Sequence, residues 1–67
     1  MNIIIDSIEY DKGLEERIQD NLKDGHEVTL DHFDSAFHGN MCIKLATAYG
    51  MKLVINGAGT QCHLTKE

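Results

Sequence analysis

The last seventeen residues of the sequence constrain the fold most strongly. "MKLVI" and "TQCHLTK" each alternate apolar and polar side chains, and this period of two is typical of half-buried strands. Between them, "NGAG" supplies residues that accept a positive φ, as a tight connection requires. The pattern therefore predicts a hairpin of two antiparallel strands from Met51 to about Lys66.

Two further strands are predicted in the N-terminal half. β-branched residues are dense in "NIIIDSIEY", and Asp11 and Gly13 bound this run, which favours a strand over residues 2–10. One face of that strand would carry Ile4, Ile8 and Tyr10. The shorter run "HEVTL" also alternates and predicts a second strand with Val28 and Leu30 directed inward.

The segment between these two strands predicts an amphipathic helix. Leu14, Ile18 and Leu22 recur every four residues and would line one face of it. Asp11 is a suitable N-cap, and Gly25 is a suitable left-handed stop.

A second helix is predicted before the hairpin, and its start has two interpretations. Helical spacing relates Phe37, Met41, Leu45 and Ala48, but Gly39 and Asn40 interrupt the pattern. The helix either begins at a Ser35 cap and tolerates the glycine, or begins after an Asn40 cap and covers Met41 to Tyr49. We favour the second interpretation, because Gly followed by Asn is a strong break signal and Asn is a good cap. Gly50 ends the helix in both.

The element order β-α-β-α-β-β predicts one small two-layer α+β domain over residues 1–67. Its economical architecture is a mixed four-stranded sheet with two helices on one face. The sequence does not determine the strand order. A chain of 67 residues buries a small core, so its stability is expected to be marginal. Self-association through edge strands of the hairpin is therefore an alternative role for the protein.

The cellular context is predicted from what the sequence contains. The first residues show neither a basic start nor a small-residue cleavage site, and no apolar run is long enough to cross a membrane. A cytoplasmic location is therefore expected, with Cys42 and Cys62 as thiols in a reducing compartment.

Four residues raise the question of a metal or nucleophilic site: His38, Cys42, Cys62 and His63. His38 and Cys42 have the spacing of two zinc ligands on one helix turn, but Cys62 and His63 would point to opposite faces of a strand. A small zinc-binding domain thus remains an alternative. The interpretation that we favour is two cysteines buried as small hydrophobes and two surface histidines, with no metal or cofactor.

Catalysis is not expected from this sequence. A Cys and His pair would also need an oxyanion site and a substrate cleft, for which so short a chain has little material. "NGAG" lacks the ending of a phosphate-binding loop and lies between two strands rather than before a helix.

The charge is distributed unevenly along the chain. Ten of the eleven acidic residues but only three of the six basic ones precede Ser35, so this half carries a net charge of −7 and the remainder +2. Seven of these acids fall between Asp6 and Asp24, where a continuous negative surface is expected. Such a surface repels nucleic acid and attracts basic proteins.

These observations predict a small acidic, non-catalytic protein-binding module. The residues expected to form its partner-binding face are Asp11, Glu15, Glu16, Asp20 and Asp24. The partner would present a basic surface of the kind that normally holds nucleic acid. Small acidic inhibitors, including virus-encoded ones that disable host defence complexes, work on this principle. Direct binding of nucleic acid or of a membrane is not expected.

Overall fold

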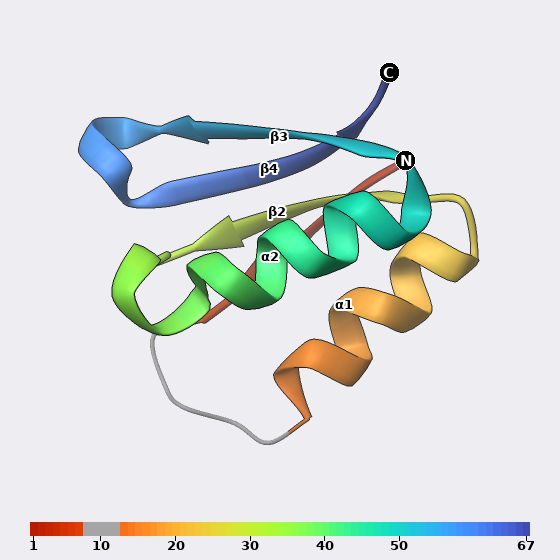
Figure 1. The fold of residues 1–67 in the computed structure, drawn as a ribbon, viewed down its shortest axis with the longest axis horizontal. Coiled ribbons are helices and arrows are strands. Elements are labelled where there is room, and N and C mark those ends of the chain that lie inside the picture. The colour runs from red at the N-terminus through yellow and green to blue at the C-terminus, as the bar shows by residue number, and fades with distance from the viewer. Residues whose placement is uncertain (8–12) are drawn as a thin grey trace.

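The computed structural model describes residues 1–7 and 13–67 of the chain. In this part, two helices and four strands follow one another in the predicted order (Figure 1). Their bounds are β1 Asn2–Asp6, α1 Leu14–Lys23, β2 Glu27–Asp31, α2 Ser35–Tyr49, β3 Met51–Asn56 and β4 Gln61–Lys66, with a 3₁₀ turn, η1 Gly57–Gly59, between the last two strands. Neither helix has the length and apolar character that crossing a membrane requires.

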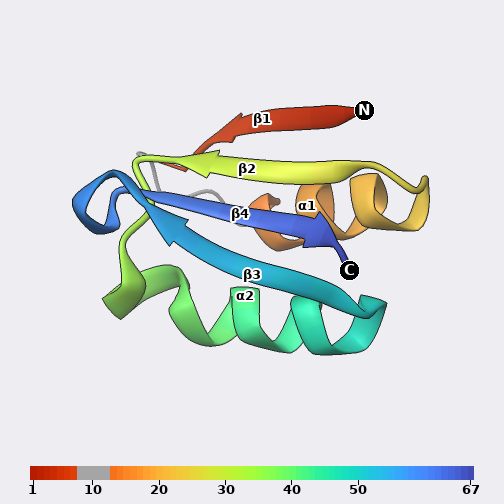
Figure 2. The same ribbon diagram turned by 90° about the horizontal axis from the view of Figure 1, so that it is seen from above.

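The four strands form one mixed sheet in the order β1-β2-β4-β3. β1 and β2 run parallel, whereas β4 is antiparallel to both of its neighbours. Both helices cover one face of this sheet and leave the other face open (Figure 2). The prediction of a small two-layer α+β fold is confirmed. The order places the last strand in the interior of the sheet, with β1 and β3 at its edges.

The core lies between the sheet and the two helices. The central strands direct Val28, Leu30 and Leu64 toward the helices, and the exposed fraction of each is 0%. Val28 pairs with Leu64 across the two strands, so their side chains form a continuous apolar layer. From α1, Ile18 packs into this layer, also at 0% exposure. Burying a side chain of this size contributes about 1.5–3 kcal/mol.

β1 ends at Asp6, immediately before Ser7. The backbone N and the Oγ of Ser7 both donate hydrogen bonds to the carbonyl oxygen of Asp31, at 2.9 and 2.7 Å. These bonds hold the end of β1 against the end of β2. The remainder of the predicted strand, with Ile8 and Tyr10, lies outside the described residues.

The isoleucines of β1 alternate between the two faces of the sheet. Ile5 is buried and pairs with Leu30, while Ile4 lies on the open face with 65% of its surface exposed. The triple isoleucine therefore contributes to the core through its first and third members, Ile3 and Ile5.

α1 has the predicted apolar side but a different N-terminus. Leu14, Ile18 and Leu22 are buried, as their spacing requires. The N-cap is Gly13, which provides no side chain for capping, and the predicted cap Asp11 lies outside the described residues. Gly25, at φ 86°, follows the helix in the left-handed conformation expected of its stop.

α2 begins at Ser35, so the favoured prediction of a shorter helix from Met41 was wrong. The cap is Asp34, whose side chain accepts a hydrogen bond from the backbone N of Ala36 at 2.9 Å. The backbone N of Asp34 donates in turn to Nδ1 of His38 at 3.0 Å. These reciprocal bonds outweigh the small helix-breaking tendency of Gly39. The predicted stop, Gly50, is confirmed as a left-handed cap at φ 63°.

The predicted C-terminal hairpin is confirmed. β3 and β4 pair from Met51 opposite Lys66 to Asn56 opposite Gln61. The connection uses positive φ at three consecutive positions, and one of them, Ala58 at φ 56°, is not a glycine. This hairpin sets the position of the edge strand β3 beside α2 (Figure 1).

Candidate functional site

The acidic residues of α1 form a short exposed row. Glu16 and Asp20 of α1 and Asp24, the C-cap of this helix, follow one another at intervals of four residues and are all exposed, which places them on one side of the helix. We call these three residues the α1 acidic stripe. Arg17 and Lys23 are exposed on the same helix and reduce the local negative charge. The sequence pattern predicted the exposure of this stripe.

Glu15 belongs to a different environment from the stripe. Its Oε1 forms an ion pair with Nζ of Lys44 on α2 at 2.9 Å. Both side chains are substantially exposed, so the pair contributes less than about 1 kcal/mol to stability. It nevertheless joins the two helices and compensates the charge of one carboxylate in the predicted face. Asp11, also predicted for that face, lies outside the described residues.

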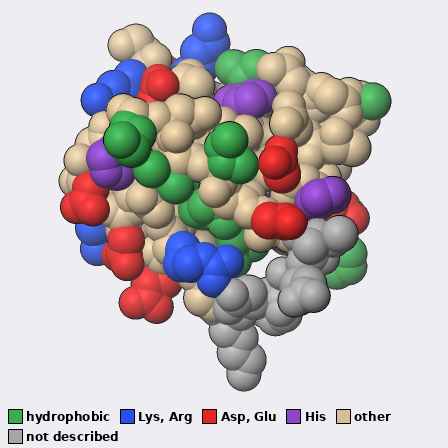
Figure 3. Space-filling view, turned by 180° about the vertical axis from the view of Figure 1, so that it is seen from behind, with side chains coloured by type: hydrophobic (Ala, Val, Ile, Leu, Met, Phe, Trp, Pro, Cys, Tyr) green, Lys and Arg blue, Asp and Glu red, His purple; other side chains and the backbone are tan. Residues whose placement is uncertain are grey.

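Three further acidic side chains, Asp6, Asp31 and Glu27, make local contacts around the sheet. Asp6 pairs with His32 at 2.9 Å, and Asp31 accepts a hydrogen bond from Nε2 of Gln61 at 2.8 Å. Glu27 accepts one from the backbone N of Lys66, also at 2.8 Å. Figure 3 shows acidic, basic and histidine side chains mixed on the face seen from behind. Among the described carboxylates, the α1 acidic stripe is therefore the most regular exposed group.

The two cysteines lie together in the core. Cys42 of α2 and Cys62 of β4 are both 0% exposed. Hydrogen bonding with Cys62, together with burial, raises the pKa of the Cys42 thiol, whereas Cys42 lowers the pKa of Cys62 against the effect of burial. Both cysteines are free thiols, and as buried groups they pack as small hydrophobes.

The two histidines lie on opposite sides of the sheet: His38 is one helical turn from Cys42 on the buried side of α2, and His63 is on the open face. His38 is buried at 8% exposure against Phe33, with ring centroids 5.9 Å apart, so its predicted surface position was wrong. It is buried because α2 starts early enough to include it. His63 lies on the open face of the sheet, where its Nδ1 hydrogen-bonds with Oγ1 of Thr29 at 2.9 Å. No group of three metal-binding side chains occurs among residues 1–7 and 13–67, so the four zinc candidates do not converge.

Above pH 9 the free energy of unfolding is expected to fall because of Cys42. The folded thiol keeps its proton where the unfolded thiol, with an ordinary pKa of 9.0, loses it. The unfolded state then binds fewer protons, and stability drops by about 1.4 kcal/mol per pH unit for one such thiol. Urea denaturation at pH values of about 8, 9 and 10 measures this slope. The double variant Cys42→Ala with Cys62→Ala should show a shallower slope, because with Cys42 alone removed, burial would raise the pKa of the remaining Cys62 thiol. An equal slope in the wild type and the double variant would contradict the explanation.

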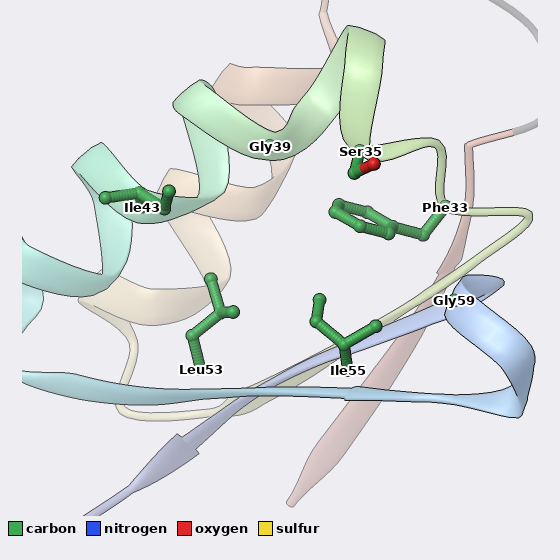
Figure 4. A pocket seen from close by; sticks show the side chains of 7 residues that line it. All are labelled: Phe33, Ser35, Gly39, Ile43, Leu53, Ile55 and Gly59. Carbon is green, nitrogen blue, oxygen red and sulfur yellow. The ribbon is translucent and has the colours of Figure 1, made fainter.

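An apolar pocket separates the first half of α2 from β3. It has a volume of about 250 Å³, and Figure 4 shows its side chains converging from the helix and the strand. Its lining residues are Phe33, Ser35, Gly39, Ile43, Leu53, Ile55 and Gly59. Ile43 is 58% exposed and Ile55 is 44% exposed, so two large apolar side chains remain in contact with water here.

Sequence reasoning missed this pocket. Ser35, Gly39 and Ile43 are spaced by four residues and share a side of α2 only because the helix begins at Ser35. With the favoured later start, the first two would have belonged to a loop. The period of four was present in the sequence and could have identified this wall of the pocket.

Comparison with known proteins identifies no relative, since no family model, curated protein or solved structure matches this chain.

Proposed function

We propose that this protein is a small, non-catalytic, cytoplasmic binding module that docks on a basic surface of a larger protein. The observation that carries the proposal is the α1 acidic stripe: three exposed carboxylates on one side of a helix whose other side is anchored in the core. A rigid helix presents these charges at fixed spacing, which lowers the conformational entropy lost on docking. Asp11 and Glu15 are the other two carboxylates proposed for this face, and Lys44 compensates the charge of Glu15.

The basic surface of the partner is proposed to be one that otherwise holds nucleic acid, so that docking inhibits the partner. A net charge of −5 supports a basic partner surface, because it favours encounter with cationic surfaces and disfavours encounter with nucleic acid. Direct nucleic-acid binding by this chain is not part of the proposal: Lys44, one of three lysines in the C-terminal half, already pairs with Glu15.

Neutralising the stripe is expected to weaken partner binding by about tenfold or more. The variant combines Glu16→Gln, Asp20→Asn and Asp24→Asn, which keep the side-chain shapes and remove the long-range attraction. Affinity capture from the source cell identifies the partner, and surface plasmon resonance with that purified partner measures the association rate and Kd. The association rate of the wild type should also fall as salt is raised.

The matched control is Lys23→Gln, which removes a positive charge from the same helix. It should leave binding unchanged or make association faster. Circular dichroism establishes that both variants keep the fold. Unchanged Kd and association rate in the folded triple variant would rule out the stripe as the docking surface. Competition by nucleic acid for the same partner distinguishes an inhibitor from a module that binds elsewhere on it.

A further inference from the structure

β3 is an edge strand with little protection against pairing: a single lysine and no proline. It forms one side of the sheet, and alternate residues of an edge strand direct their backbone N–H and C=O groups away from the neighbouring strand. Over its six residues β3 contains no proline, and its only charged side chain is Lys52. A strand of this length and composition is a template for a further strand.

The apolar pocket lies beside this edge. Leu53 and Ile55 reach it from β3, and Ile43 reaches it from α2 (Figure 4). An added strand next to β3 would cover these side chains on the helix side of the sheet. Strand pairing would therefore be accompanied by burial of apolar surface, as in stable interfaces.

The distribution of charge favours a second copy of this chain as the molecule that pairs with β3. The protein carries a net charge of −5, so two copies repel each other wherever acidic side chains meet. α2 and β3, which flank the pocket, contain no Asp or Glu. Their two lysines are Lys44, already paired with Glu15, and Lys52. Two copies can therefore approach each other through α2 and β3 without opposing carboxylates of these two elements.

We propose that two copies of the chain pair through β3, antiparallel, around a two-fold axis at Val54. Residues directly opposite in such a pair share one face of the sheet. With the axis at Val54, Leu53 lies opposite Ile55 of the second copy on the helix side. On the open face, Lys52 lies opposite Asn56 of the second copy, so no like charges are opposed. The result is a continuous eight-stranded sheet with both pockets covered at its centre.

Sedimentation equilibrium from about 1 μM to about 1 mM tests the proposal. The wild-type mass should rise with concentration from 7.5 kDa toward twice that value. Val54→Lys places two ammonium groups opposite each other at the axis and is expected to raise the dimer Kd at least about tenfold. The matched control, Ile4→Lys, adds the same charge on the open face of the other edge strand, β1, and should leave Kd within about twofold.

Three results would overturn the proposal. These are a constant monomer mass across the concentration range, dimerisation that survives Val54→Lys, and dimerisation that Ile4→Lys abolishes. Hydrogen exchange of the wild type gives a second test that does not depend on any variant folding. Amides of β3 should exchange more slowly at high concentration, while amides of β1 should not change. Equal β3 exchange at both concentrations would also overturn the proposal.

Discussion

Leu64→Ala is expected to leave much of the chain unfolded at 25 °C. Leu64 is 0% exposed in the interior strand β4, where it pairs with Val28 on one side and Leu53 on the other. Truncating such a leucine costs about 2–5 kcal/mol, because the transfer free energy is lost and a cavity remains. A domain of this size has a total stability of comparable magnitude. Circular dichroism during urea denaturation measures the loss.

Ile4→Ala is the matched control for this prediction. It shortens an aliphatic side chain on the open face, where 65% of the residue is already exposed. The control should lose less than about 1 kcal/mol. If the two variants had the same urea midpoint, the core would not lie between the sheet and the helices as described.

Met41→Pro is expected to destabilise the protein by about 3 kcal/mol or more. In the structure Met41 lies in the interior of α2, where proline removes a backbone hydrogen bond and its ring clashes with the preceding turn. If the helix began at Met41 instead, proline would occupy its first position, where it is well tolerated. Thermal unfolding followed by circular dichroism distinguishes these two outcomes.

Gly39→Ala tests the same start of α2, but through an expected gain of stability rather than a loss. A Cβ added at Gly39 meets only the Cβ of Ser35, at the ordinary contact distance of 3.9 Å. Alanine is a better helix former than glycine, so the variant should gain about 0.5–1 kcal/mol. A loss of stability in Gly39→Ala together with tolerance of Met41→Pro would place the helix start after Asn40.

The contrast between α1 and α2 explains how much of the fold was predictable. Three buried side chains at a strict period of four identified α1, and local turn chemistry identified the hairpin. The start of α2 was mispredicted because local signals compete there: Gly39 favours a break, but the Asp34 cap and the packing of His38 against Phe33 favour a helix. The cap and this contact decided the outcome, and the residue pattern alone does not say whether they outweigh the break signal at Gly39.

The features of the candidate sites also differ in whether the sequence predicts them. The exposure of Glu16, Asp20 and Asp24 follows from helical spacing, which the sequence provides. The pairing of Glu15 with Lys44 depends on how α1 and α2 lie against each other. The position of β3 at an edge depends on the strand order, since β4 could have occupied that edge with the same hairpin. No local pattern specifies either arrangement.

The central position of β4 also has a consequence for how the protein is made. A ribosome adds residues 61–66 after all the other elements, yet this strand separates β2 from β3 in the finished sheet. Until those residues leave the exit tunnel, the β1–β2 pair and β3 have no strand to join them, and their apolar faces have no common layer. The nascent chain therefore cannot complete its sheet before this step, and part of its apolar surface stays exposed to water until then.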